Sequence, residues 1–259
     1  MSTSKIAITI GAYRLAEFVQ LNIRACRQIF GDVPILVSDD ASPESGAIQS
    51  MAEAEQVDYI CSPHRMSHCS GDWQAFINGQ AYAEEVGAEI AIKLSQRLIP
   101  LDTRVRDLLL QPLEDHRNWA VLPTAMHRRN LARSGTQFYA NLPVLTDIVA
   151  WRVSRFSPQQ LLEIYRDRAA RATRETSNLQ VVEHTWHHIM EGYAKDHVVL
   201  QTELANPAPM APKIYLRKAQ CNRGEYLHAA ERLGVAGTFD VREWNKIEDK
   251  GYKCRPDAV

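Results

Sequence analysis

Short runs of β-branched and apolar residues alternate with amphipathic segments of helix length through the first hundred residues of this chain. Strands are expected at residues 5–10, 34–38, 57–61 and 89–94, and the clearest helices at residues 15–30 and 71–86. A repeated strand–helix–strand pattern predicts parallel strands joined by right-handed crossovers. The predicted fold class is therefore α/β, a Rossmann-like sandwich with a mainly parallel central sheet flanked by helices.

The pattern is less regular after residue 100. Helices are expected at residues 104–113, 158–172 and 178–192, and short strands at residues 120–122 and 197–200. Residues 142–151 form an apolar segment that is interrupted by Thr146 and Asp147. No internal repeat or low-complexity tract marks a boundary, so we expect one domain that spans residues 1–259.

The composition is that of a soluble globular protein, with 45% hydrophobic and 24% charged residues and a formal net charge of −1. A near-neutral charge argues against nucleic acid as a partner, because phosphate contacts need a surplus of Lys and Arg. No apolar run approaches the roughly 20 residues needed to cross a bilayer, and the first residues lack the features of a signal peptide. A cytoplasmic location is expected. The five cysteines form no C-x-x-C pair, so neither a disulfide framework nor a cysteine zinc site is expected.

Short segments that carry polar groups follow the strands predicted in the first hundred residues. They are Gly11, Ala12, Tyr13 and Arg14 after the first strand, Asp39 and Asp40 after the second, Pro63, His64 and Arg65 after the third, and Ser95, Gln96 and Arg97 after the fourth. In parallel α/β sheets, ligands bind beyond the carboxyl ends of the strands, near the point where the strand order reverses. This arrangement predicts a site for a nucleotide-type ligand at that edge of the sheet.

Three motifs in this half are spaced as in a known enzyme family. The first strand is followed by Gly11-Ala12-Tyr13-Arg14, the second by Asp39-Asp40-Ala41-Ser42, and a later helix carries Gly71, Ala75, Gly79 and Ala83. Over residues 5–97 the chain resembles the inverting GT-A glycosyltransferases, above all their family 2. The resemblance implies a nucleotide-binding half at residues 1–100, in which the first loop and the acidic pair hold base and ribose. It also implies that residues 101–259 form an acceptor-binding half and a C-terminal extension.

The chain departs from this family at the metal-binding motif. At the end of the fourth strand the family has Asp-x-Asp, whose carboxylates bind Mn²⁺ or Mg²⁺ and so neutralise the leaving diphosphate. Here the sequence reads Ser95-Gln96-Arg97, a poor ligand set for a hard divalent cation, so no metal cofactor is expected. Either Arg97, helped by Arg65 or by Arg128 and Arg129, supplies the positive charge directly, or the chain has lost catalysis and only binds a ligand or a partner.

An inverting transfer needs a general base that takes the proton of the acceptor hydroxyl. In the resembled family this base is an Asp or Glu downstream of the metal motif, which here points to Glu183 or to Asp147. A helix cap or a structural ion pair is the alternative role for each of them. The candidates for binding phosphate or the acceptor are His127, Arg128, Arg129 and His184.

The tryptophans also have two interpretations. Trp73 and Trp119 are expected in the core, whereas Trp151, Trp186 and Trp244 suit either the core or a platform on which a sugar stacks. His184 and His188 are four residues apart, but the H-E-x-x-H motif is absent, so a zinc site is not expected.

The leading hypothesis is a metal-independent inverting glycosyltransferase of hexosyltransferase type that builds a surface polysaccharide or glycoconjugate. Its partners would be a nucleotide-sugar donor and a glycan or glycoconjugate acceptor. Peripheral membrane association and the oligomeric state are left open. The alternative hypothesis is a catalytically inactive module of the same fold, which binds a nucleotide, a glycan or a partner protein. A nucleotidyltransferase is a weaker third hypothesis, because only Gly11 is available for the Gly-rich loop that such enzymes need.

Overall fold

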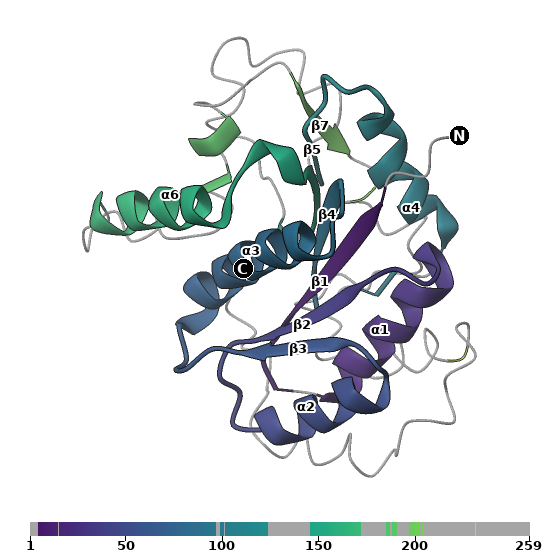
Figure 1. The fold of residues 1–259 in the computed structure, drawn as a ribbon, viewed down its shortest axis with the longest axis vertical. Helices are drawn as coiled ribbons and strands as arrows, with labels where there is room; N and C mark the ends of the chain where they lie inside the picture. The colour runs from purple at the N-terminus through teal and green to yellow at the C-terminus, as the bar shows by residue number, and fades with distance from the viewer. Residues whose placement is uncertain are drawn as a thin grey trace, which may run out of the picture.

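The computed structural model describes residues 5–14, 16–96, 99–100, 102–123, 146–171, 185–186, 188–190, 197–201, 204 and 231. These residues form a seven-stranded sheet that runs through the middle of the molecule, with helices on both sides (Figure 1). The strands are β1 (Ile6–Ala12), β2 (Ile35–Asp39), β3 (Asp58–Cys61), β4 (Ile90–Ser95), β5 (Ala120–Pro123), β6 (Ile148–Arg152) and β7 (Val198–Gln201). Their order in the sheet is β3-β2-β1-β4-β6-β5-β7.

The first four strands are parallel, as the sequence predicts. β1 lies between β2 and β4, so that Ile8 pairs with Ile35 on one side and with Ile92 on the other. The chain moves outward from β1 to β2 and β3, and then returns to place β4 on the opposite side of β1. The strand order therefore reverses between β1 and β4, and the carboxyl ends of these two strands define the switch point of the sheet.

The second half adds antiparallel pairing that the sequence pattern did not reveal. β6 is antiparallel to both β4 and β5, whereas β5 and β7 are parallel. Leu94, near the carboxyl end of β4, pairs with Ile148, the first residue of β6. The chain therefore enters β6 from the carboxyl edge of β4, and this brings Thr146 and Asp147 to the switch point.

Helices cover both faces of the sheet. In Figure 1, α1 (Ala16–Phe30), α2 (Ser45–Ala54) and α4 (Thr103–Leu110) lie on one side, and α3 (Ser67–Glu85) and α6 (Pro158–Arg171) on the other. The expected helix over residues 104–113 is divided into α4 and a 3-10 turn at Gln111–Glu114, which contains Pro112. A further 3-10 turn, Val153–Arg155, follows β6. Among the described residues, no helix is long and apolar enough to cross a membrane.

Each face of the sheet has its own core, because successive side chains of a strand point to opposite sides. On the α1 side, Ile8 and Ile10 of β1 pack with Val19 and Ile23. On the α3 side the core is aromatic and contains four tryptophans, Trp73, Trp119, Trp151 and Trp186, whose exposed fractions are 0 to 4%. Trp151 and Trp186 are thus core residues and form no sugar-stacking platform; Trp244 lies outside the described residues.

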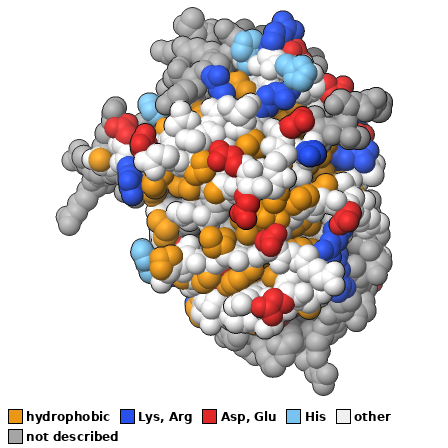
Figure 2. Space-filling view, in the orientation of Figure 1, with side chains coloured by type: hydrophobic (Ala, Val, Ile, Leu, Met, Phe, Trp, Pro, Cys, Tyr) orange, Lys and Arg blue, Asp and Glu red, His pale blue; other side chains and the backbone are white. Residues whose placement is uncertain are grey.

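The β3 edge of the sheet is its most exposed part. β3 pairs only with β2 among the described strands, and its Ile60 is the single large hydrophobic side chain of the described residues that is exposed, at 43%. Figure 2 shows the molecule from the side seen in Figure 1. Apolar side chains form a band across the middle of this face, with acidic groups among and beside them. The strand is only four residues long, which limits its capacity to pair with another chain.

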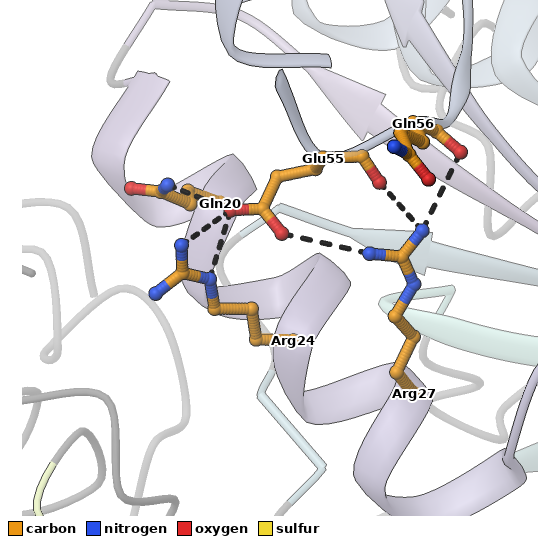
Figure 3. A network of polar contacts seen from close by, with 5 residues as sticks. All are labelled: Gln20, Arg24, Arg27, Glu55 and Gln56. Atoms are coloured by element: carbon orange, nitrogen blue, oxygen red, sulfur yellow. Dashed lines mark hydrogen bonds and ion pairs between the residues drawn. The ribbon is translucent and has the colours of Figure 1, made fainter. Parts of the chain in front are cut away.

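A charged cluster joins α1 to the end of α2 (Figure 3). The Glu55 carboxylate accepts hydrogen bonds from Gln20 (2.8 Å) and Arg24 (2.6 Å) and pairs with Arg27 (3.6 Å). Arg27 also donates to the carbonyl oxygens of Glu55 and Gln56. Burial raises the pKa of the Glu55 carboxyl, but the hydrogen bonds from Arg24 and Gln20 and the charges of Arg24 and Arg27 together outweigh burial, and the pKa lies below its ordinary value.

Candidate functional site

Gln96 links the two loops of the switch point. The Tyr13 N–H donates to Gln96 Oε1 (2.8 Å), and Gln96 Nε2 donates to the Tyr13 carbonyl oxygen (2.8 Å). The Gln96 N–H donates to the carbonyl oxygen of Gly11 (3.0 Å). The buried side-chain amide of Gln96 thus continues the β1–β4 ladder beyond the strand ends and fixes the backbone that carries Tyr13. Positioning Tyr13 is the role that these contacts give to Gln96.

The loop after β1 is also tied to the loop after β2. The Asp40 N–H donates to the carbonyl oxygen of Ala12 (3.0 Å), and the Arg14 N–H donates to Ser42 Oγ (2.6 Å). Arg14 has a φ of +61°, a left-handed conformation that is uncommon for a residue with a side chain. Such strain is often found at functional sites. Ala12, Arg14 and Asp40 are therefore brought together, as the sequence predicts for the carboxyl ends of neighbouring strands.

Asp39 is fully buried at the end of β2. Its Oδ1 accepts a hydrogen bond from the Ser42 N–H (3.1 Å), and its Oδ2 accepts one from the Tyr59 hydroxyl (2.9 Å). Burial and the neighbouring charge of Asp40 raise the pKa of the Asp39 carboxyl, and together they outweigh the hydrogen bonds that lower it. The site therefore contains a carboxylate whose charged form is disfavoured by its surroundings.

Asp40 faces the N-terminus of α3. Its Oδ1 accepts a hydrogen bond from the Met66 N–H (2.7 Å), at the residue that precedes the helix. A Cβ atom at Gly71 would overlap the Asp40 carboxylate, so the close approach of α3 requires glycine there. Burial raises the pKa of Asp40, although the Met66 N–H and the charges of Arg65 and His64 act against it. A perturbed acidic pair at a strand end is typical of functional sites.

Two guanidinium groups lie next to the Tyr13 ring. Arg65 Cζ is 4.3 Å from the ring centroid and Arg14 Cζ is 5.3 Å from it, within the range of cation–π interactions. The Arg65 side chain is exposed, whereas Tyr13 and Arg14 are half-buried. The switch point therefore places two positive charges around one aromatic ring, beside the acidic pair, where an anionic ligand could reach them.

The end of β4 is connected to the segment before β6. The Ser95 N–H donates to the carbonyl oxygen of Asp147 (2.7 Å), and Asn22 Nδ2 donates to the carbonyl oxygen of Ser95 (3.1 Å). Asp147 is half-buried. Asp147, one of the two predicted candidates for the general base, thus lies at the same edge of the sheet as the acidic pair. In the chain it is 108 residues after Asp39 and 107 residues after Asp40.

The side chains at the end of β4 do not fit a divalent cation. The sequence offers a hydroxyl and an amide at Ser95 and Gln96, and the amide oxygen of Gln96 already accepts the Tyr13 N–H. Mg²⁺ and Mn²⁺ prefer carboxylate oxygens. In the described part of the chain, no three His, Cys, Asp or Glu side chains are grouped closely enough to hold a metal ion.

Several predicted site residues lie outside the described residues, and their roles stay predictions. They are Arg97, His127, Arg128, Arg129, Glu183 and His184.

The structure also contains a charged pair that sequence reasoning missed. Lys93 of β4 is fully buried, and its Nζ forms an ion pair with Asp72 Oδ1 of α3 and donates to the carbonyl oxygen of Thr146 (3.1 Å). A lysine within the otherwise apolar run of residues 90–94 was the available signal, because lysine is almost never fully buried unless it is paired. The partner could not be named from the sequence, since it lies on a helix 21 residues earlier.

Comparisons with known proteins do not assign this chain to a family. No protein-family model matches it, and no curated protein matches it. Among solved structures, a cytidylyltransferase from Leptospira borgpetersenii is 15% identical, with a TM-score of 0.46, over 90% of this chain and 94% of that one. The glucosyl-3-phosphoglycerate synthase of Mycobacterium tuberculosis, in complex with Mn²⁺, uridine diphosphate and glucosyl-3-phosphoglycerate, is 11% identical, with a TM-score of 0.48, over 90% and 81%.

Proposed function

We propose that this protein is a GT-A-like glycosyltransferase that moves a sugar from a nucleotide-sugar donor to a glycan or glycoconjugate acceptor, with inversion and without a metal ion. The observation that carries the proposal is the composition of the switch point. There the buried Asp39–Asp40 pair, whose pKa values are raised, lies beside the Tyr13 ring and the guanidinium groups of Arg14 and Arg65. Ligands of parallel α/β sheets bind in this position.

The acidic pair and Tyr13 suit the nucleoside part of the donor. Carboxylate oxygens accept hydrogen bonds from the N–H groups of a base and from ribose hydroxyls. Burial disfavours the charged form of both carboxyls, so donor groups of a ligand would relieve a cost that the ligand-free protein carries. The two hydrogen bonds between the Gln96 side-chain amide and the Tyr13 backbone, which we call the Gln96 clamp, keep this backbone in place before the ligand binds.

Arginine side chains suit the diphosphate. Arg65 is exposed and Arg14 is half-buried, and both guanidinium groups lie near the Tyr13 ring. Guanidinium groups bind phosphate oxygens in bidentate fashion and stabilise the charge that develops on a leaving diphosphate. Arg97, which follows Gln96 in the chain, is proposed as the third member of this cationic set.

The acceptor side requires a base. In the proposed reaction a carboxylate takes the proton of the acceptor hydroxyl while the oxygen attacks the anomeric carbon. A new carbon–oxygen bond forms there, the bond from that carbon to the diphosphate breaks, and the nucleoside diphosphate leaves with the electron pair. Asp147 is proposed as this base, because it lies beside Ser95 at the switch point. Glu183 is the alternative base.

A binding module without transfer activity is the second candidate function. It is favoured by the extent to which the site satisfies its own polar groups: both Asp39 oxygens and the Gln96 amide accept or donate internal hydrogen bonds. Such a site could bind a nucleotide, a glycan or a partner and do no chemistry.

Thermal unfolding with and without nucleotides tests the proposal. A nucleoside diphosphate at a hundred times its Kd adds about 2.7 kcal/mol of stability, which for a chain of this size raises Tm by roughly 5–10 °C. We expect UDP or GDP to give such a rise and EDTA to leave it unchanged. A rise that appears only with Mn²⁺ would refute the metal-free part, and no rise with any nucleotide would refute the proposal. Slow hydrolysis of the matching nucleotide sugar then separates an enzyme from a binding module.

A further inference from the structure

Lys93 is a buried charge at the centre of the sheet. Its side chain has an exposed fraction of 0% and lies on β4, between β1 and β6. Taking an ammonium group out of water is costly unless the charge is paired and its hydrogen bonds are satisfied. The ion pair with Asp72, the hydrogen bond to the Thr146 carbonyl oxygen and the Phe76 ring, whose centroid is 4.9 Å from Nζ, supply this compensation.

Asp72 differs from Lys93 in that water can reach it. Its side chain has an exposed fraction of 24%, and one carboxylate oxygen, Oδ1, is engaged with Lys93. A carboxylate accepts about four hydrogen bonds through its two oxygens. The pair therefore has a buried positive end, which is held by the sheet, and a partly exposed negative end on α3.

The Asp72 carboxylate lies at the switch point. A Cβ atom built on Gly11 would come within 3.8 Å of Asp72 Oδ1, 3.7 Å of Lys93 Cε and 3.2 Å of Ala75 Cβ. Gly11 pairs with Ser95, at the carboxyl ends of β1 and β4. Asp72 is thus next to the loop that carries Tyr13 and on the edge that presents the acidic pair.

We propose that Asp72 is a substrate-binding residue of this site and that Lys93 is its positioning residue. Asp72 Oδ2, the carboxylate oxygen that is not paired with Lys93, accepts hydrogen bonds from hydroxyl groups of a nucleotide sugar. The inference rests on the proposed function and adds the recognition of a polyol to it. A lone carboxylate next to a diphosphate would repel it. The pair with Lys93 has no net charge, so Asp72 can offer acceptor oxygens to hydroxyl groups without opposing the phosphates.

Titration calorimetry with Asp72→Asn tests the inference. The probes are UDP with UDP-glucose, or GDP with GDP-mannose, according to the nucleotide that stabilises the unmodified protein, and pyrophosphate, which has no hydroxyl group on carbon. We expect Asp72→Asn to weaken binding of the nucleotide sugar by between about tenfold and a hundredfold, and to leave the Kd of pyrophosphate within about twofold. A loss shared by the nucleoside diphosphate assigns Asp72 to the ribose, and a loss confined to the nucleotide sugar assigns it to the sugar; either supports the inference.

A second variant covers the case in which Asp72→Asn fails to fold because it leaves the Lys93 charge unpaired. The double variant Asp72→Asn/Lys93→Met removes both charges, and we expect it to show the same selective loss. Lys93→Met alone leaves the Asp72 carboxylate without its positive partner, so it should also weaken the binding of pyrophosphate, which the double variant should not do. Asp32→Asn, at an exposed aspartate, is the matched control and should bind like the unmodified protein.

Three outcomes would overturn the inference. Unchanged binding of the nucleotide sugar by a folded Asp72 variant would reduce Asp72 to a structural partner of Lys93 and leave the proposed function intact. If the Asp72 variants lost affinity for pyrophosphate as much as for the nucleotide sugar, the substitution would disturb the site in general and Asp72 would not recognise hydroxyl groups. If the unmodified protein bound none of the nucleotide probes, the proposed function would fail and this inference with it.

Discussion

Asp39 and Asp40 show how one pair of residues can serve the fold and the site in opposite ways. Both carboxyls are buried, and both accept backbone hydrogen bonds, from Ser42 and from Met66. Even so, burial keeps their pKa values above the ordinary value of 3.8. For each group the cost to stability is absent below pH 3.8, sets in as the pH rises toward the folded-state pKa, and is complete above it.

Asp40→Asn should therefore separate stability from binding. The amide oxygen can still accept the Met66 N–H, while the disfavoured charge is removed. We expect a Tm at pH 7 that is equal to or slightly above that of the unmodified protein, and nucleotide affinity that falls at least about tenfold. Asp32→Asn, at an exposed position, should change neither quantity. A variant that lost stability at pH 7 and kept its affinity would contradict this interpretation of Asp40.

Gly71→Ala should damage both the fold and the site, because its Cβ atom would overlap the Asp40 carboxylate. We expect a loss of about 1–3 kcal/mol in the free energy of unfolding together with weaker nucleotide binding. Gly46→Ala is the matched control: it also replaces a helical glycine, but nothing lies within 4 Å of the new Cβ atom. Urea titrations should show that this control gains up to about 1 kcal/mol. Equal effects of the two substitutions would exclude a special packing role for Gly71.

At the level of single residues, the sequence indicated which residues lie at the switch point but did not indicate their contacts. The acidic pair and Tyr13 could be predicted because they follow β-branched runs, where ligand-binding residues gather. The partners that define their roles could not, because Tyr59, Ser42 and Gln96 meet them only after the sheet has assembled. Hydrogen bonds between residues far apart in the chain leave no periodic signal in the sequence.

At the level of elements, the first four strands and their helices were predictable because each has a complete local pattern. β6 was harder to recognise, since its five residues follow the polar Thr146–Asp147 interruption of an apolar segment. Its antiparallel direction follows from tertiary pairing with β4 and β5. That direction is what brings Asp147 beside Ser95, so this part of the site depended on a feature that local patterns do not encode.

The α1–α2 connection gives the fold an acid-sensitive element. The Glu55 pKa is lowered below its ordinary value of 4.5, so its carboxylate stabilises the fold above pH 4.5, and this contribution is lost as the pH falls through the folded-state pKa. We expect Glu55→Gln to lower the free energy of unfolding at pH 7 by about 1 kcal/mol and by less as the pH falls. Denaturant titrations between pH 7 and pH 3 measure this difference.

The exposed Glu53→Gln is the control for this pH dependence, since Glu53 lies two residues away and its side chain bonds only to Gln49 among the described residues. Its unfolding free energy should follow that of the unmodified protein across the pH range. If Glu55→Gln showed a constant difference at every pH, the ionised form of Glu55 would not be the source of the stabilisation.

At the scale of the whole molecule, the strand order explains why residues from both halves of the chain reach one edge. The strand order reverses between β1 and β4, which defines the switch point. The antiparallel direction of β6 brings Asp147 to the same edge of the sheet. The Gln96 clamp and the Lys93–Asp72 pair then tie β1, β4, α3 and the segment before β6 together. The loops that carry the proposed donor site are thus held to regular elements by hydrogen bonds, which favours a preformed shape.

A crystal structure of the protein with UDP or GDP, prepared with EDTA, tests the central claim most directly. The proposal predicts a diphosphate beyond the carboxyl ends of β1 and β4, within hydrogen-bonding distance of arginine guanidinium groups, with the base directed toward Asp39 and Asp40. It also predicts that adding Mn²⁺ leaves this arrangement unchanged. A nucleotide bound elsewhere on the sheet, or one held only through a metal ion and protein carboxylates, would contradict the claim.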